Sequence, residues 1–303
     1  MSPLGRPASP LTRLAAVVVN YRSSDETLAA VHSLRASRRP PEPIIVVDNG
    51  SADGSAGRIA AAGCEVALVA LGRNLGFAGG ANAGIRMALE AGAHAVLLLN
   101  SDARVHPDCV DRLKAALVDP QVGVVGPTLL GWDTPYVIES IGMEYSPWSG
   151  RMRQLGAGQR LPCRPGTRIV DGIVGTAMLI RRDVFEAIGL LDEAYFFYCE
   201  DLDFCVRARR AGFRSMHVSE AIAWHRGAHS IGPRSPDRIY WATRSHLRLA
   251  SRALPLPGPL SFVRSAAIVA LNGAHLVARR AAPLWPGARA WLRAVWHHLD
   301  RHE

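Results

Sequence analysis

Short apolar runs alternate with amphipathic stretches through the first part of the chain. The apolar runs, each typical of a strand buried on both faces, are residues 14–19, 43–47, 65–70 and 94–99. The segments between them that have a helical pattern are residues 25–36, 54–62 and 78–91. Asp25 and Asp53 are start signals for the first two helices. This alternation predicts an α/β fold with a mostly parallel, Rossmann-like sheet flanked by helices.

The pattern becomes less regular after this region. Residues 127–170 are rich in Gly, Pro and Trp, which predicts loops with short strands. A strand is predicted at 174–180, a short helix from Asp183, and a helix at 200–211 with acids in its first turn. Helical segments follow residue 237. We therefore expect a flexible N-terminus at 1–13, one domain at 14–236 and a helical, basic extension at 237–303.

The composition is that of a globular protein, with 49% hydrophobic and 20% charged residues in 303. The net charge is +9, and residues 238–303 supply +8 of it, from ten arginines against Asp300 and Glu303. A basic extension on a nearly neutral body indicates a local anionic partner and not nucleic acid. The five cysteines form no C-x-x-C pair, and the Pro-rich start does not resemble a signal peptide, so a cytoplasmic protein is expected.

Several enzyme classes lack their signatures in this sequence. A P-loop needs a Gly-Lys step, but Lys114, which is the only lysine, follows Leu113. Neither G-x-G-x-x-G nor G-x-S-x-G occurs. These absences argue against P-loop NTPases, dinucleotide-dependent dehydrogenases and serine hydrolases with a nucleophile elbow.

Polar residues follow the predicted strands, at the sheet edge where open α/β sheets bind ligands. Asp48 ends one strand and could accept a hydrogen bond from a nucleotide base. Asp102 ends another and could hold Mg²⁺ or Mn²⁺ on a diphosphate. Both are also ordinary turn and cap residues. The glycine-rich run at 72–84 would allow close approach of an anion, or simply close packing of a helix on the sheet.

The densest cluster of chemical groups is YFFYCEDLDF, residues 195–204. The helix dipole favours acids in a first turn whatever their function. Three carboxylates beside an apolar patch are also a good setting for a general base. His225 follows a predicted strand and is either a ligand or a structural histidine.

Six motifs in order carry a resemblance to a known family. They are VVVNYRSSDET, VVDNGSADGS, GRNLGFAGGANAGI, LLLNSDARVHPD, the long segment from GTAMLI to RRAGF, and AWHRGAHS, which together span residues 14–230. The series resembles the family 2 glycosyltransferases, and more narrowly their rhamnosyltransferase-like branch. The resemblance implies a GT-A fold, a nucleotide-diphosphate sugar donor, Mg²⁺ or Mn²⁺, and inversion at the anomeric carbon.

The resemblance also implies roles for individual residues. Asp201, in an E-D pair with Glu200, would be the catalytic base, while Asp102 and His225 would serve the metal or diphosphate. The implied donor-binding residues are Val19, Tyr21, Asp48, Asn74, Gly76, Asn82, Asn100 and Asp102. The implied acceptor-binding residues are Gly175, Tyr198 and Asp203. The sequence departs from the family pattern at Asn100, where an acid is usual, and at Gly172, where a large aromatic residue is expected.

Transfer of rhamnose from dTDP-rhamnose to a glycan or lipid-linked acceptor is the leading hypothesis on the branch resemblance. Galactofuranose or another hexose is an alternative sugar. A sugar-phosphate nucleotidyltransferase is a second enzyme class, although its usual lysine near the N-terminus is absent here. A non-catalytic binding module is a third, which the acids Asp102, Glu200 and Asp201 argue against.

The end of the chain predicts an amphipathic helix at 284–299. Arg289, Arg293 and His297 fall on one stripe, and the opposite side is formed by Leu284, Ala288, Trp291, Leu292, Val295 and Leu299. This pattern suits an anionic membrane surface at the inner face of the cell membrane, or a helix packed on the catalytic domain. Residues 260–278 are apolar but include polar residues such as Arg264, so we do not expect them to span a membrane.

Overall fold

The computed structural model describes residues 11–161, 166–227, 235–278 and 282–299. Most of the N-terminus predicted to be flexible, residues 1–10, lies outside this range. The strands are β1 (Leu14–Asn20), β2 (Ile44–Asp48), β3 (Ala67–Ala70), β4 (Ala95–Asn100), β5 (Ala103–Val105), β6 (Val122–Gly131), β7 (Ile138–Ser140), β8 (Met143–Tyr145), β9 (Met152–Gln154), β10 (Arg168–Val170), β11 (Ala177–Arg181) and β12 (Arg214–His225). The helices are α1 (Ser24–Arg35), α2 (Ser55–Ala61), α3 (Gly76–Glu90), α4 (Cys109–Ala116), α5 (Arg182–Ile188), α6 (Glu200–Arg210), α7 (Pro236–Ala253), α8 (Gly258–Ala278) and α9 (Leu284–Leu299).

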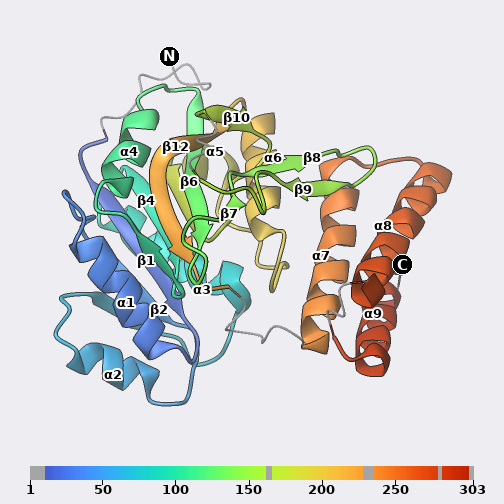
Figure 1. The fold of residues 1–303 in the computed structure, drawn as a ribbon, viewed down its shortest axis with the longest axis horizontal. Helices are drawn as coiled ribbons and strands as arrows, with labels where there is room; N and C mark the ends of the chain where they lie inside the picture. The colour runs from blue at the N-terminus through green and yellow to red at the C-terminus, as the bar shows by residue number, and fades with distance from the viewer. Residues whose placement is uncertain (1–10, 162–165, 228–234, 279–281, 300–303) are drawn as a thin grey trace.

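A 10-stranded sheet forms the centre of the molecule, in the order β10-β12-β6-β11-β4-β1-β2-β3, with β5 on β12 and β7 on β6 (Figure 1). Strands β3, β2, β1 and β4 are parallel neighbours, and β6 is parallel to β12. Strand β11 is antiparallel to both β4 and β6, so those two strands point the same way. The prediction of a mostly parallel α/β sheet is confirmed.

Helices cover both faces of this sheet. Alternate residues of each central strand point to opposite faces, so Val17 packs in the core under α3, α5 and α6, while Ala16 packs under α1, α2 and α4. Both residues are almost fully buried. This two-sided burial explains why the strands are continuously apolar in sequence.

Strand β6 begins in a segment for which no element was predicted, and its second half lies inside the stretch predicted as loops and short strands. Its sequence contains Pro127, a residue that normally argues against a central strand. The β6–β12 ladder has a register shift between Val218 and Ile222, and Pro127 pairs with Val218 at that shift. An irregularity of this kind accommodates a residue that cannot donate to the ladder. The predicted strand at 174–180 begins later, at Ala177.

The extension contains the predicted helices, which lie beside the sheet domain in Figure 1. The first of them, α7, begins with Pro236 in its first turn, and the Ser235 hydroxyl accepts from the Asp237 N–H. It packs on α6 through a cluster in which Leu249 and Ala253 meet Tyr195, Leu202 and Val206. The domain boundary predicted at 236–237 therefore falls within a helix that contacts the sheet domain.

Two residues of the basic stripe predicted on α9 contact α7. Arg293 lies 3.5 Å from the Asp237 carboxylate and 4.4 Å from the centre of the Tyr240 ring. The Tyr240 hydroxyl is 2.7 Å from Nδ1 of His297. Arg293 and His297 thus contact α7, but both remain exposed, as Arg289 does. Trp285, Leu292 and Trp296 on the same helix are exposed as well.

Candidate active site

A cavity of about 450 Å³ lies at the carboxyl ends of β1 and β4. Eleven of the predicted site residues line it: Val19, Tyr21, Asn74, Gly76, Asn100, Asp102, Gly175, Tyr198, Glu200, Asp201 and His225. They come from segments far apart in the chain, because the ends of neighbouring parallel strands meet at one sheet edge. The fold thus brings the E-D pair, Asp102 and His225 into one cavity.

Three predicted site residues do not line this cavity. Asn82 is 1% exposed, and its side chain donates to the Leu191 carbonyl and accepts from the Leu191 N–H. It also donates to the Glu193 carboxylate at 2.9 Å. All its polar groups are used to fix the loop between α5 and α6. Asn82 therefore has a structural role in this loop, and its predicted donor contact stays a prediction.

Asp203 is the second such residue. Its side chain is 4% exposed, and Oδ2 accepts from Nε of Arg207 at 2.7 Å. Oδ1 accepts from the Tyr195 hydroxyl at 3.2 Å. Arg207 in turn donates to the carbonyls of Ile188 and Leu190. Asp203 therefore holds α6 to the preceding loop, and its predicted acceptor contact stays a prediction.

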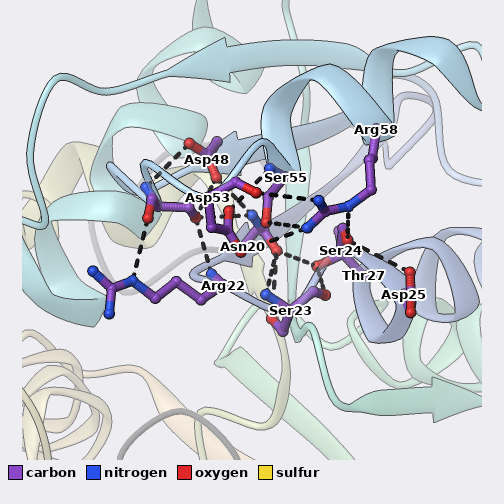
Figure 2. A network of polar contacts seen from close by, with 11 residues as sticks. Asn20, Arg22, Ser23, Ser24, Asp25, Thr27, Asp48, Asp53, Ser55 and Arg58 are labelled. Atoms are coloured by element: carbon purple, nitrogen blue, oxygen red, sulfur yellow. Dashed lines mark hydrogen bonds and ion pairs between the residues drawn. The ribbon is translucent and has the colours of Figure 1, made fainter.

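Asp48 is the third. Its carboxylate accepts from Asn20 Nδ2 at 2.6 Å and from the Ser51 hydroxyl and N–H. Figure 2 shows this network between the end of β1, the start of α1 and the loop before α2. Asn20 Oδ1 also accepts from the Thr27 hydroxyl at 2.9 Å. Asp48 lies beside the cavity and shapes the loops at its edge; the neighbouring Asn49 is the residue that lines it.

The acid pair is held at the cavity by a strained turn. Tyr198 and Cys199 have φ values of 70° and 66°, in the left-handed region, and α6 begins directly after them at Glu200. Such residues persist only where the surrounding structure holds them, and they are frequent at functional sites. Asp201 Oδ2 accepts from the Gly175 N–H at 2.7 Å, which orients the carboxylate.

Burial raises the pKa of both acids. Burial and the neighbouring Asp201 carboxylate raise the pKa of Glu200 to about 8. Burial also raises the pKa of Asp201, against hydrogen bonds from the Gly175 and Leu202 N–H groups that lower it. One oxygen of Glu200 is buried without a hydrogen-bond partner among the described residues. A carboxyl pair with raised pKa values facing a cavity is suited to general base catalysis.

Asp102 and His225 meet on the β4 side of the cavity. His225 Nε2 lies 3.4 Å from Asp102 Oδ1, and its Nδ1 lies 2.8 Å from Glu139 Oε1. Burial lowers the pKa of His225, but the two carboxylates outweigh this and raise it to about 10. Asn100 Oδ1, also in the cavity lining, is buried with no hydrogen-bond partner in the described part of the chain. Asp102, Asn100 and His225 present oxygen and imidazole ligands of the kind that Mg²⁺ and Mn²⁺ bind.

Helix α7 closes the cavity on another side. Arg238 lines the cavity and donates from Nε to the Tyr198 hydroxyl at 3.0 Å. Trp241 stacks on Phe196 at a centroid distance of 4.6 Å, and the Ser245 hydroxyl donates to the Phe197 carbonyl. Helix α7 therefore positions the aromatic loop that precedes the E-D pair.

Gly76 allows a second close approach to that loop. Its φ is 75°, and a Cβ placed there would lie 2.3 Å from the Phe196 carbonyl oxygen. The Phe77 N–H donates to the same oxygen at 2.9 Å. The glycine-rich segment and the aromatic loop are thus joined by backbone contact, which any side chain at this position would disrupt.

The sequence interpretation missed Glu139, Arg238 and Asn49 as cavity residues. Glu139 lies in the segment predicted to be irregular, and Arg238 in the predicted extension. Neither is part of a motif with recognisable spacing. Asn49 directly follows Asp48 at a strand end, so its position was a usable signal.

Comparison with known proteins now identifies the family. Residues 10–250 match the sequence profile described as glycosyltransferase like family 2. The chain belongs to glycosyltransferase family 2. This family 2 glycosyltransferase is 30% identical over 245 residues to the N-acetylglucosaminyl-diphospho-decaprenol L-rhamnosyltransferase of Mycobacterium tuberculosis, a match that covers 72% of this chain and 78% of the relative.

Two further relatives are named for the transfer of two different sugars. The dTDP-rhamnosyl transferase RfbF of Shigella flexneri is 25% identical, over 63% of this chain and 66% of the relative. The galactofuranosyltransferase GlfT1 of Mycobacterium tuberculosis is 31% identical, over 65% of this chain and 64% of the relative. The family 2 relatives therefore agree on sugar transfer but not on one sugar.

Solved structures of GT-A glycosyltransferases share the fold. The mannosyltransferase PcManGT of Pyrobaculum calidifontis, solved with GDP-Man and Mn²⁺, superposes with a TM-score of 0.54 at 17% identity, over 98% of this chain and 85% of that one. GalNAc-T7, solved with UDP, GalNAc and Mn²⁺, gives a TM-score of 0.60 at 15% identity, over 86% of this chain and 55% of that one. The predicted GT-A fold of this family 2 enzyme is confirmed.

The raised pKa of Glu200 predicts how stability of this glycosyltransferase depends on pH. With an ordinary pKa near 4.5 when unfolded and about 8 when folded, Glu200 retains its proton more strongly in the folded state. The stabilisation from the protonated form is complete below about 4.5 and is lost as pH rises to about 8. Gln at this position does not titrate. The free energy of unfolding of Glu200→Gln, relative to that of wild type, should therefore increase by roughly 1–3 kcal/mol between pH 4.5 and pH 8.

Urea unfolding of wild type and Glu200→Gln at a series of pH values measures this difference. Glu90→Gln is the matched control, because Glu90 is an exposed glutamate on α3. Its stability relative to wild type should not change over the same window. If the free energies of unfolding of wild type and Glu200→Gln change with pH in the same way, Glu200 does not hold its proton in the folded protein.

Proposed function

We propose that this enzyme transfers a sugar, with inversion, from a nucleotide-diphosphate donor to a hydroxyl of a glycan or lipid-linked acceptor. The observation that carries the proposal is that one cavity holds both an oriented carboxylate pair and the Asp102–His225 pair. Inverting displacement needs one base for the acceptor hydroxyl and one positive centre for the leaving diphosphate. A retaining double displacement would need an additional nucleophile.

Asp201 acts as the base in this proposal. It takes the proton of the acceptor hydroxyl while that oxygen forms its bond to the anomeric carbon. The bond from the anomeric carbon to the diphosphate oxygen breaks, and its electron pair leaves with the nucleoside diphosphate. The Gly175 N–H donates to Asp201 Oδ2 and the Leu202 N–H donates to Oδ1, each at 2.7 Å, so the remaining lone pairs of the carboxylate are available to the acceptor.

Asp102 and His225 would hold a divalent cation, Mg²⁺ or Mn²⁺, together with the donor diphosphate. The unpartnered Oδ1 of Asn100 supports this assignment, because a buried acceptor without a donor is a costly arrangement that a cation would relieve. Among the described residues no cluster of three or more His, Cys, Asp and Glu side chains forms a complete metal cage. Phosphate oxygens would complete the coordination, and the cation would stabilise the charge on the leaving diphosphate.

The proposed donor is dTDP-rhamnose, on the basis of the relatives named as rhamnosyltransferases. The test incubates the enzyme with Mg²⁺ or Mn²⁺ and a panel that includes dTDP-rhamnose and UDP-galactofuranose. Among the donors in the panel, we expect only dTDP-rhamnose to be hydrolysed slowly, with release of dTDP. Preference for UDP-galactofuranose would favour the alternative suggested by GlfT1, and release of pyrophosphate in the presence of sugar phosphate and nucleoside triphosphate would indicate a nucleotidyltransferase.

We also propose that the enzyme works in the cytoplasm, at the inner face of the membrane, through the outer surface of α8 and α9. Eight large apolar side chains on these helices are at least 55% exposed: Leu260, Phe262, Val263, Leu271, Val277, Trp285, Leu292 and Trp296. Exposed large apolar side chains that include Trp and Phe, on a segment with a basic charge excess, suit the lipid interface. We name these eight residues the α8–α9 apolar surface.

The other side of α8 faces the protein, where buried Ile268 and Leu276 lie beside polar residues. Among described helices, only Gly258–Val277 is long and apolar enough to cross a membrane, on length and composition alone. Arg264 on this helix is 4% exposed and donates to the carbonyls of Pro147 and Leu254. Asn272 lies 3.2 Å from His246 on α7. A helix that packs against the protein on one side and is exposed on the other is better suited to lie in the membrane interface than to span the membrane.

Vesicle binding tests this surface in the full chain. Phe262→Ser, Trp285→Ser and Trp296→Ser combined should strongly reduce co-sedimentation with anionic vesicles, because they remove aromatic area from the apolar side. Binding of wild type should also weaken at high salt, since each basic residue near such a surface contributes roughly 1 kcal/mol. Tyr136→Ser is the matched control, because Tyr136 is 71% exposed but lies between β6 and β7. Equal pelleting of the triple variant and the control would refute this docking surface.

A further inference from the structure

We propose that Glu139 is a positioning residue that sets which nitrogen of His225 faces the cation and diphosphate. The inference rests on the proposed function, because it concerns the residues assigned to the cation. Glu139 lies outside all six motifs and comes from the short strand β7. It is the only carboxylate other than Asp102 that contacts His225 among the described residues.

The local structure of β7 delivers Glu139 to the cavity. Ile138 and Ser140 on either side of it are fully buried, so the alternation of a strand turns Glu139 to the opposite face. The pairing of β7 with β6 has a register shift between Leu129 and Leu130, opposite this position. Shifts of this kind re-aim a side chain, and they are frequent beside active sites. Glu139 lines the cavity as a result.

The contact of Glu139 with His225 decides the state of the imidazole ring. An ionised carboxylate can only accept hydrogen bonds, so the ring nitrogen that it contacts must carry hydrogen. That nitrogen is Nδ1, at 2.8 Å from Glu139 Oε1. When a cation displaces the proton of Nε2, that nitrogen presents its lone pair on the side where Asp102 Oδ1 lies at 3.4 Å. A metal-binding histidine needs this arrangement, since a cation binds the lone pair and not the N–H.

Glu139 therefore has two separable features: its acceptor oxygen and its negative charge. Glu139→Gln keeps an oxygen that can accept from Nδ1–H but removes the charge. Glu139→Ala removes both. If Glu139 positions the ring, Gln should retain most of the effect that Ala loses. If Glu139 instead binds the cation directly, Gln and Ala should lose similar affinity, because the anionic oxygen is absent in both.

Calorimetric titration of Mn²⁺ into the full-length protein in the presence of dTDP provides the first readout. Glu139→Ala should weaken Mn²⁺ binding by roughly 10–100-fold, the typical cost of removing such a partner, and Glu139→Gln should lie close to wild type. Glu144→Ala is the matched control. Glu144 on β8 pairs with Arg153 and has a side chain that is 53% exposed, so its loss should leave Mn²⁺ affinity unchanged.

Nitrogen NMR of the histidine rings, with Mg²⁺ and dTDP bound, provides a second readout that does not depend on turnover. We expect the His225 ring to be the Nδ1–H form in wild type and Glu139→Gln, and to lose this preference in Glu139→Ala. Unchanged Mn²⁺ affinity and ring form in Glu139→Ala would overturn the inference while leaving the proposed function intact. Failure of the wild type itself to bind Mn²⁺ with dTDP would overturn the cation assignment and this inference together.

Discussion

Asp201→Asn should abolish sugar transfer while leaving donor binding nearly intact. Loss of a general base typically lowers the rate by ~10²–10⁴-fold. The amide can still accept from the Gly175 N–H, so the loop geometry that depends on this 2.7 Å hydrogen bond is retained. The effect should therefore fall on turnover and not on affinity for dTDP-rhamnose. Steady-state transfer and calorimetric titration of the donor separate the two.

The neighbouring acid provides the sharpest comparison for this variant. Glu200 lies in the same cavity with one unpartnered oxygen, so it is the next candidate for the base. Turnover of Asp201→Asn within about threefold of wild type, far less than the usual loss, would remove Asp201 from the role and direct attention to Glu200→Gln. Asp119→Asn is the matched control, because Asp119 is exposed on the loop between α4 and β6. Its turnover should equal that of wild type.

Asp102→Ala should have the second large effect, on metal-dependent donor binding. Asn100 is neutral, so no other residue of that motif can replace the carboxylate. The loss of Mn²⁺ affinity should exceed the roughly 10–100-fold typical of losing a partner of a ligand, since here a ligand itself is removed. Added Mn²⁺ should restore little donor binding. The measurement is titration of dTDP-rhamnose with Mn²⁺ or with a chelator.

The donor affinities of Asp102→Ala and of a control variant test the assignment of the cation site. Donor affinity that is equal in wild type and Asp102→Ala, with and without chelator, would show that the cation site has been misassigned. Asp111→Ala is the matched control, because Asp111 is an acid of α4 that lines a different cavity. Its donor affinity should follow that of wild type under both conditions.

The sequence by itself determined the sheet and half of the residues that line the cavity. Strands β1 to β4 are continuously apolar because helices cover both of their faces, and such runs are visible without coordinates. Because ligands bind beyond the carboxyl ends of parallel strands, the polar residues that follow these runs were recognisable as site candidates. Asn100 and Asp102 after β4 are in the cavity for this reason.

Family motifs located the residues that periodicity could not. The E-D pair and His225 lie on α6 and at the end of β12, and the fold places both in the cavity. Motif position alone did not separate a side chain that faces the cavity from one that faces the core. Asn82 and Asp203 are in motifs, yet each has its polar groups bound by a loop backbone or by Arg207. A motif is a stretch of chain, but a helix turns only part of each stretch toward a given site.

Only the tertiary structure decided which distant segments complete the cavity. Glu139 reaches His225 from a short strand that was not distinguishable from loop, and Arg238 reaches Tyr198 from a helix predicted to belong to a separate extension. Tertiary packing also decided the orientation of α9. Arg293 and His297 contact Tyr240 on α7, and apolar residues of α9 are exposed to solvent. A periodic pattern fixes which residues share a face of one element. Which partner that face meets depends on packing between elements, since side-chain contacts over long sequence separations have no local signal.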